Sequence, residues 1–259
     1  MNWRSWVLIG AVLAAVVMMF LFPAIPQDEA YHNFADGRVF LSMPNCLNVL
    51  SNTFFLVVGF FGIRFVLRRD ARAAAAFVDP LERWPYFVFF VGVTLTAFGS
   101  SYYHFNPNDQ TLVWDRIPMT IGFMALVAAM LAERISVKLG ICLLFPLVAL
   151  GAASVIYWDV TQLRGHGDLR PYALAQFGSL LLVLLLIALF RPRYTRTADL
   201  GIALALYILA KLLEAADKPI FAVRHIVSGH TLKHLAAAIS TYAILRMLRL
   251  RTPLAPTRL

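Results

Sequence analysis

Apolar stretches about as long as a bilayer is thick recur along this chain, and they constrain its fold more than any other feature. A helix needs about 20 mostly apolar residues to cross the hydrocarbon core of a membrane. The pattern predicts eight membrane-spanning helices: Trp6–Phe22, Cys46–Leu67, Pro85–Phe105, Leu112–Leu131, Leu139–Tyr157, Tyr172–Phe190, Leu200–Ala216 and Thr231–Leu248.

The composition excludes a water-soluble domain and a disordered chain. Hydrophobic residues make up 60% of the sequence and charged residues 14%, against roughly 45–50% and about 25% in soluble domains. Two cysteines, Cys46 and Cys142, are too few for a disulfide framework or a cysteine-rich zinc module. The formal net charge of +9 does not indicate nucleic acid, because the basic residues punctuate apolar runs instead of clustering on one face. We therefore expect an all-α, polytopic membrane protein.

The spans fall into a core and an extra helix. We find no fixed-period repeat and no low-complexity linker, so residues 26–259 are interpreted as one membrane domain, a seven-transmembrane-helix bundle. Residues 1–25 are interpreted as an additional N-terminal anchor helix. A cleaved signal peptide is the alternative, but Phe22–Pro26 contains no clean small-x-small cleavage site.

The basic residues also predict the topology. One set of connections holds Arg4, Arg68, Arg69, Arg72, Arg83, Arg134, Lys138, Arg191, Arg193, Arg196, Arg246, Arg249, Arg251 and Arg258. The opposite set holds Arg38, Arg164, Arg170, Lys218 and Arg224. Positive residues favour the cytoplasmic side, so both termini are expected there, in agreement with an even number of spans.

Ionisable residues inside membrane spans are costly, and they are functional candidates by default. His104, Asp115, His230 and His234 all fall at span ends that face the outer leaflet. His230 and His234 are four residues apart and share a helix face, as do Ser100 and His104. The short loop between the third and fourth spans makes them antiparallel neighbours and brings Asp115 near His104. Three imidazoles with an open fourth position are a catalytic zinc set, and a nearby carboxylate can accept a proton from water.

Structural interpretations of the same residues stay open at this point. A histidine at a membrane interface is often a hydrogen-bonded structural residue. Asp115 could pair with Arg116 at a helix start, and Ser100 could bond a carbonyl of its own helix. The coincidence of three histidines, a carboxylate and a serine at one depth favours the metal site.

These residues carry a resemblance to a known family. The pattern Ser100-x-x-x-His104, then Asp115, then His230-x-x-x-His234 resembles the signature of the alkaline ceramidases, which belong to the CREST superfamily of seven-helix membrane hydrolases. The run Asn48–Asn52 is similar to the family's Asn-x-x-Ser-Asn segment. The resemblance covers about residues 28–250.

The resemblance implies a function and a role for each matching residue. His104, His230 and His234 would bind zinc, and Ser100 and Asp115 would contact the zinc-bound water, with Asp115 as general base. The reaction would be hydrolysis of the amide of a ceramide-like lipid, which releases a fatty acid and a sphingoid base. Eukaryotic members hold calcium with an acidic stretch before the first core span. Asn45 stands here where a glutamate is expected, which weakens the case for calcium.

A different class of function competes with the enzyme. The alternative is a non-catalytic seven-helix receptor or scaffold in which zinc only ties helices together. A transporter ranks third, because the inverted repeats typical of transporters are not visible. Lys211, Glu214 and Asp217 lie on one side of the seventh span, where a buried ion pair is the first interpretation and a lipid head-group site the second. The acyl amide, or an ester, and the oligomeric state are left open.

Overall fold

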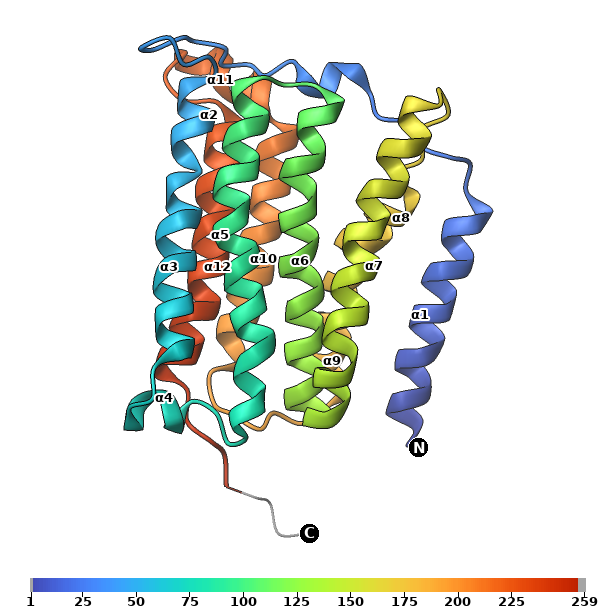
Figure 1. Ribbon diagram of the computed structural model, residues 1–259, viewed down its shortest axis with the longest axis vertical. Helices are drawn as coiled ribbons and strands as arrows, with labels where there is room; N and C mark the ends of the chain where they lie inside the picture. Colours follow the sequence, from blue (N-terminus) through green and yellow to red (C-terminus); the bar gives the residue numbers. More distant parts are fainter. Residues whose placement is uncertain (1, 256–259) are drawn as a thin grey trace.

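The computed structural model describes residues 2–255, apart from the side chains of residues 72 and 73. This part of the chain is all-helical, and its long helices run roughly parallel or antiparallel to one another (Figure 1). The elements are α1 (Trp3–Leu21), η1 (Glu29–His32), α2 (Cys46–Ser51), α3 (Thr53–Leu67), α4 (Ala71–Ala75), η2 (Pro80–Glu82), α5 (Arg83–Phe105), α6 (Asp109–Arg134), α7 (Val137–Leu163), α8 (Arg170–Ala173), η3 (Leu174–Gly178), α9 (Ser179–Leu189), α10 (Thr197–Ala215), α11 (Asp217–Arg224) and α12 (Gly229–Leu250).

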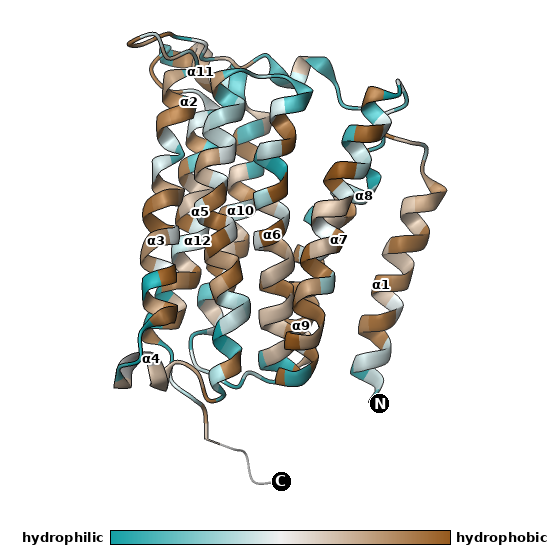
Figure 2. Ribbon diagram, viewed as in Figure 1, coloured by the Kyte–Doolittle hydropathy of each residue, from teal (hydrophilic) through white to brown (hydrophobic). Residues whose placement is uncertain are grey.

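Within the described residues, six segments are long and apolar enough to cross a membrane, so the expectation of a multi-pass membrane protein is confirmed at that level. They are Trp3–Leu21, Cys46–Leu67, Pro80–Phe105, Asp109–Arg134, Val137–Leu163 and Arg170–Leu189. Figure 2 shows hydrophobic residues along the middle of the helices and hydrophilic residues toward their ends.

The last two predicted spans are helices, α10 and α12, but they carry charged or polar side chains within the span and are not among the six. Three charged side chains lie in α10, and α12 carries a lysine between two histidines: Asp199, Lys211, Glu214, His230, Lys233 and His234. Both helices lie within the bundle, where α12 packs along α10 and against α3 (Figure 1). Their polar side chains turn toward each other or toward the interior, as the site below illustrates.

Helices that follow one another in the chain pack side by side in most of the bundle. The chain runs through α3, α5, α6 and α7 as successive packed neighbours, and α9 packs on α6. The connection between α5 and α6 is short, and the two helices are antiparallel neighbours as predicted (Figure 1). A capping box between Asn108 and Thr111 starts α6 directly after this turn.

Two glycines allow helices to approach each other next to the candidate site. A Cβ at Gly99 of α5 would lie 1.9 Å from the carbonyl oxygen of Trp114 in α6. A Cβ at Gly229, the first residue of α12, would lie 2.3 Å from the carbonyl oxygen of Leu213 in α10. Small residues of this kind let backbones meet in membrane bundles. They place Ser100 and His230, the following residues, at helix contacts.

The first helix stands apart from the bundle. Most side chains of α1 are exposed, and α1 lies at the edge of the bundle, where it contacts α9 and η3 (Figure 1). Such an apolar exposed surface suits lipid contact. Its C-terminal end is fastened by Arg170, which donates to the carbonyl oxygens of Met19 (3.2 Å) and Phe22.

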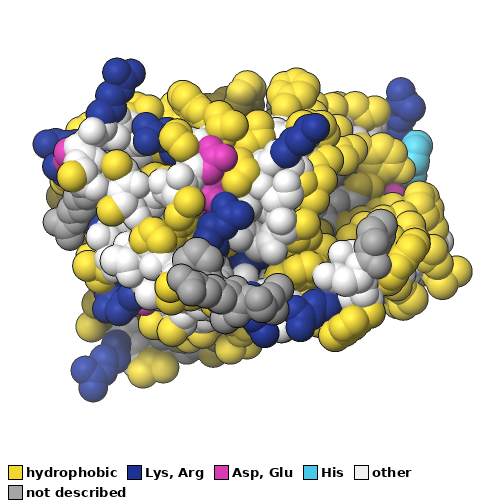
Figure 3. Space-filling view, turned by 90° about the horizontal axis from the view of Figure 1, so that it is seen from below, with side chains coloured by type: hydrophobic (Ala, Val, Ile, Leu, Met, Phe, Trp, Pro, Cys, Tyr) yellow, Lys and Arg dark blue, Asp and Glu magenta, His cyan; other side chains and the backbone are white. Residues whose placement is uncertain are grey.

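Basic side chains gather at the end of the bundle where α1 begins and α12 ends. Figure 3 shows this face with lysine and arginine side chains spread among hydrophobic ones. The helix ends that meet there are those of α3, α6 and α9 and the starts of α5 and α10 (Figure 1). Of the predicted set, Arg258 and the side chain of Arg72 lie outside the described residues.

Candidate metal centre

Three histidines from two helices meet near one end of the bundle. His104 lies in the last turn of α5, and His230 and His234 lie in the first two turns of α12. Ser228 starts α12 by accepting a hydrogen bond from the backbone N–H of Thr231 at 3.1 Å. The four-residue spacing then puts both α12 histidines on the face toward α5.

The geometry of the three rings suits a bound metal ion. All three side chains are buried, with exposed fractions of 0%, 3% and 2% for His104, His230 and His234. One ring nitrogen from each lies within 4.8 Å of the others. The Nε2 atoms of His104 and His234 are 3.2 Å apart, close to the roughly 3.3 Å expected between two nitrogens on one tetrahedral zinc.

An unpartnered ring nitrogen supports the same conclusion. His230 Nε2 is buried without a hydrogen-bond partner in the described structure. His104 Nδ1 is also unpartnered, but it is not the nitrogen through which His104 faces His234. A buried polar atom without a partner is costly, and a metal ion or proton between the nitrogens would remove that cost for the atoms that face it. The chemistry of this donor set is therefore compatible with zinc.

A serine from a different helix orients His234. Ser51, at the end of α2, places its Oγ 2.8 Å from His234 Nδ1 and donates to the carbonyl oxygen of Asn48 at 3.0 Å. Because the single hydroxyl proton is used in that second bond, Ser51 accepts from Nδ1–H. The Nε2 lone pair of His234 is then left facing His104, as in metal sites where the other ring nitrogen is hydrogen-bonded.

The segment before α2 covers the histidine cluster. The ring of Phe34 lies 4.7 Å from that of His104 and 4.6 Å from that of His230, centroid to centroid. Asn45, in the left-handed region at φ 48°, donates from its side chain to the carbonyl oxygen of His104 at 2.9 Å. Asn45 thus ties this segment to the helix of a candidate ligand.

Asp217 ties the same segment to α12. Its two carboxylate oxygens accept from the backbone N–H of His230 at 2.7 Å and from that of Ala35 at 2.9 Å. The carboxylate sits at the positive end of the helix that begins at Gly229, where an anion is favoured. The sequence pattern grouped Asp217 with Lys211 and Glu214. In the structure Asp217 accepts from backbone N–H groups, whereas Lys211 and Glu214 form an ion pair with each other.

Ser100 and Asp115 lie beside the histidines and line one cavity with His234. Asp115 is buried, and its carboxylate takes a side-chain hydrogen bond from Ser100. The alternative ion pair with Arg116 is not formed among the described residues. Successive residues of a helix point in different directions, and the Arg116 guanidinium instead stacks on the rings of Trp158 and Tyr172 at 4.2 and 4.7 Å.

The buried ion pair expected in the seventh span is present, and a third residue from another helix joins it. Glu214 pairs with Lys211 of its own helix and with Lys233 of α12 at 3.1 Å. The Tyr31 hydroxyl donates to Glu214 at 3.2 Å. Burial, and next the charge of Glu214, raise the pKa of Tyr31 well above its usual value, so its phenol stays protonated as a donor.

The cavity reaches from these polar groups into the apolar interior. Its volume is about 340 Å³, within the range usual for small-molecule sites. Ser100, Asp115, Lys233 and His234 line its polar part. The remainder runs among α6, α9, α10 and α12, where its walls include Phe123, Leu126, Val183, Leu204, Ala237 and Ile244.

Compared with models of known protein families and with curated proteins, the chain matches none. The candidate site is therefore described by its own geometry. The structure brings the three predicted histidines together and places Ser100 and Asp115 on the adjoining cavity. It adds Phe34 and Lys233, which no local pattern in the sequence marks, and it gives Asp217 a contact with the backbone of His230 that the sequence did not predict.

Proposed function

We propose that this chain is a zinc-dependent membrane hydrolase that cleaves the amide bond of a ceramide-like lipid, releasing a fatty acid and a sphingoid base. The observation that carries the proposal is a cluster of three buried histidines, of which His234 lines the polar end of a mainly apolar cavity together with the carboxylate of Asp115. The resemblance to the alkaline ceramidases in Ser100, His104, Asp115, His230 and His234 points to the same chemistry.

The proposed metal ligands are His104, His230 and His234. Zinc bound there would supply Lewis acidity, which polarises an amide carbonyl and makes a nearby water a better nucleophile at neutral pH. The chain contributes the fixed positions of the ligands: Ser51 holds the ring of His234, and Asp217 holds the backbone at His230. Such support keeps ligands in place before substrate binds.

Asp115 is the proposed general base and acid. The attacking water gives a proton to the carboxylate as the new C–O bond forms, and Asp115 then returns that proton to the nitrogen as the C–N bond breaks. Ser100 is a proposed catalytic partner that holds the carboxylate by a hydrogen bond. Exclusion of bulk water by the surrounding helices strengthens these interactions.

The apolar part of the cavity is the proposed site of the acyl chain. Its walls are mostly hydrophobic side chains of α6, α9, α10 and α12. An aliphatic tail placed there loses its contact with water or lipid head groups and brings its carbonyl to the polar end. This arrangement supports a lipid substrate over a small polar one.

The proposed membrane arrangement has a core of seven crossings and α1 as an eighth. Paired charges support inclusion of α10 and α12 as crossings, because Lys211, Glu214 and Lys233 satisfy one another instead of facing lipid. With both termini in the cytoplasm, as the arginine asymmetry predicts, the histidines lie toward the outer leaflet.

Release of fatty acid from a defined ceramide tests the proposal. Purified protein in detergent, loaded with zinc, is mixed with an N-acylsphingosine, and both products are quantified by mass spectrometry. We expect equal amounts of fatty acid and sphingosine. Removal of zinc by a chelator should abolish the release of both products, and addition of zinc should restore it. Protein that holds one zinc per chain and releases neither product from ceramide or other acyl amides would support the scaffold alternative instead.

A further inference from the structure

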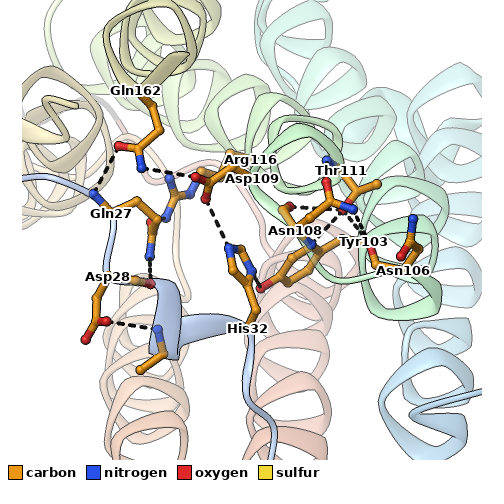
Figure 4. A network of polar contacts seen from close by, with 11 residues as sticks. Gln27, Asp28, His32, Tyr103, Asn106, Asn108, Asp109, Thr111, Arg116 and Gln162 are labelled. Atoms are coloured by element: carbon orange, nitrogen blue, oxygen red, sulfur yellow. Dashed lines mark hydrogen bonds and ion pairs between the residues drawn. The ribbon is translucent and has the colours of Figure 1, made fainter. Parts of the chain in front are cut away.

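Several polar side chains at the histidine end of the bundle satisfy one another, whereas two arginines at the opposite end have no carboxylate partner. In Figure 4, Gln162 donates to Asp109 at 3.0 Å, and Asp109 pairs with His32 at 3.0 Å. At the other end, no ion pair joins Arg64 or Arg249 to a carboxylate in the described part of the chain. The fold itself leaves these two charges uncompensated.

Both arginines line one hollow between α3 and α12, which pack against each other. The hollow has a volume of about 360 Å³, and its lining is Phe61, Arg64, Phe65, Arg68 and Arg249. Arg68 pairs with Asp70, but no carboxylate belongs to the lining. The guanidinium carbon of Arg249 lies 5.9 Å from the ring centroid of Phe61, so this cation of α12 contacts α3. Cations that share one hollow repel each other, and an anion between them would remove the repulsion.

The hollow continues an exposed apolar stripe along α3. Phe54, Val57, Phe61, Arg64 and Arg68 alternate in steps of three and four residues, which places them on one face of the helix. The first three are exposed, at 54%, 47% and 43%. At a rise of 1.5 Å per residue, Phe54 and Arg64 are about 15 Å apart along the helix. That length is about half the thickness of the hydrocarbon core, the depth that one leaflet fills with acyl chains.

We propose that this hollow binds the head-group phosphate of an acidic phospholipid, with the acyl chains lying along Phe54, Val57 and Phe61. The phosphate oxygens accept hydrogen bonds from Arg64 and Arg249, whose fork of N–H donors matches phosphate geometry. Arginines about one turn from a helix end reach head-group depth while their stems stay against apolar surface. This inference depends on α3 and α12 lying in the membrane and is independent of the hydrolase function.

A lipid accounts for both parts of this surface. A soluble anion would use the arginines alone and would leave the exposed stripe of α3 without a role. The arginine asymmetry predicts that this end lies in the cytoplasmic leaflet, where acidic lipids produce a negative surface potential and basic pockets between membrane helices hold their head groups. The charge of the hollow and the length of the stripe therefore favour the same occupant.

Native mass spectrometry with two lipids of identical chains tests the proposal. Dioleoylphosphatidylglycerol carries a net negative charge, and dioleoylphosphatidylcholine is its zwitterionic counterpart. Each lipid is titrated into purified protein in detergent, and the bound fraction gives a dissociation constant. We expect wild type to bind phosphatidylglycerol at least about tenfold more tightly. The double variant Arg64→Gln/Arg249→Gln should lose most of this preference, because each arginine near an anionic lipid contributes about fivefold.

A charge-matched variant keeps the test specific. Arg69→Gln/Arg191→Gln removes two exposed arginines that follow α3 and α9 at the same end of the bundle but lie outside the hollow. This variant should keep the preference of wild type. Equal affinity of wild type for the two lipids would overturn the proposal, whether or not the variants fold. An equal loss of preference in both double variants would also overturn it, because the effect would then be one of overall charge.

A head group without acyl chains separates a lipid site from a site for soluble anions. Glycerophosphoglycerol should bind at least about 100-fold more weakly than phosphatidylglycerol, because it loses the apolar contact with α3. Affinity equal to that of the lipid would make the hollow a soluble-anion site and contradict the proposal. The same spectra report the oligomeric state. A dimer that takes up no phosphatidylglycerol would assign the stripe to a contact between two copies of the chain instead.

Discussion

The hydroxyl oxygen of Ser51 lies 2.8 Å from Nδ1 of His234, across the contact between α2 and α12. The same hydroxyl donates to the carbonyl oxygen of Asn48, so it accepts the proton on Nδ1 and fixes the tautomer of the imidazole. The lone pair of Nε2 is then directed toward His104, 3.2 Å away. A residue 183 positions distant in the sequence thus decides which nitrogen of His234 is available to a metal ion.

Ser51→Ala should weaken metal binding without removing a ligand. Loss of a hydrogen-bond partner of a metal-binding histidine typically costs about 10- to 100-fold in metal affinity. Competition between the protein and a zinc chelator of known affinity measures the change. Ser101→Ala is the control, because Ser101 bonds only the carbonyl oxygen of Val49 nearby. Equal zinc affinity in Ser51→Ala and wild type would show that this hydrogen bond does not support the site.

Asp115→Asn should abolish most turnover while zinc stays bound. Asparagine keeps the shape of the side chain and its bond with Ser100, but it cannot take up a proton. Hydrolysis of an acyl amide should fall by about 10²- to 10⁴-fold, the usual contribution of a positioned acid–base group. Initial rates and zinc content are measured on the same preparation. Wild-type rates would exclude Asp115 as the base, and loss of zinc would instead make its carboxylate a metal ligand.

Much of this architecture could be predicted from the sequence, because lipid solvent leaves few alternatives for long apolar segments. The positions of His104, Asp115 and His230 followed from helix ends and from a short loop that makes α5 and α6 neighbours. The apolar pattern also predicted a span at α10, although Lys211 and Glu214 interrupt it. Those charges are compensated by Lys233 from another helix, and such compensation is a tertiary contact that hydropathy does not record.

Other parts of the site have no local signal. Phe34 covers two histidines from a segment with no regular pattern, and Asp217 bonds the backbone of Ala35 and His230. Both contacts depend on how that segment lies across the end of the bundle. The sequence also left open an ion pair between Asp115 and Arg116, and the structure shows the Arg116 guanidinium stacked on Trp158 and Tyr172 instead.

The loop between α7 and α8 should respond to acid through Asp168. The hydrogen bond from Arg170 holds the pKa of Asp168 below its ordinary value, and burial opposes this effect. A depressed pKa means that the pair stabilises the folded state above the unfolded pKa of about 3.9, and that this contribution is lost as the pH falls through the lower folded pKa. The melting temperature in detergent, followed between pH 6 and pH 3, checks this prediction. The difference between wild type and Asp168→Asn should be largest at pH 6 and shrink toward pH 3; a constant difference would contradict it.

The orientation in the membrane can be tested by cysteine labelling of intact cells. With Cys142 replaced, a cysteine at exposed position His166 should react with an impermeant maleimide from outside the cell. A cysteine at exposed position Lys138, at the other end of α7, should react only after the membrane is permeabilised. The reverse pattern would place both termini outside and the histidines at the cytoplasmic leaflet.

The metal content of the purified protein tests the central claim most directly. Elemental analysis of protein prepared without added metal should find about one zinc per chain in the wild type, and almost none in the variant that combines His104→Ala, His230→Ala and His234→Ala. Folding of that variant is checked by its elution and circular dichroism. A wild-type protein that takes up no zinc even when zinc is supplied, or a folded triple variant that keeps one zinc per chain, would contradict the assignment of these three histidines.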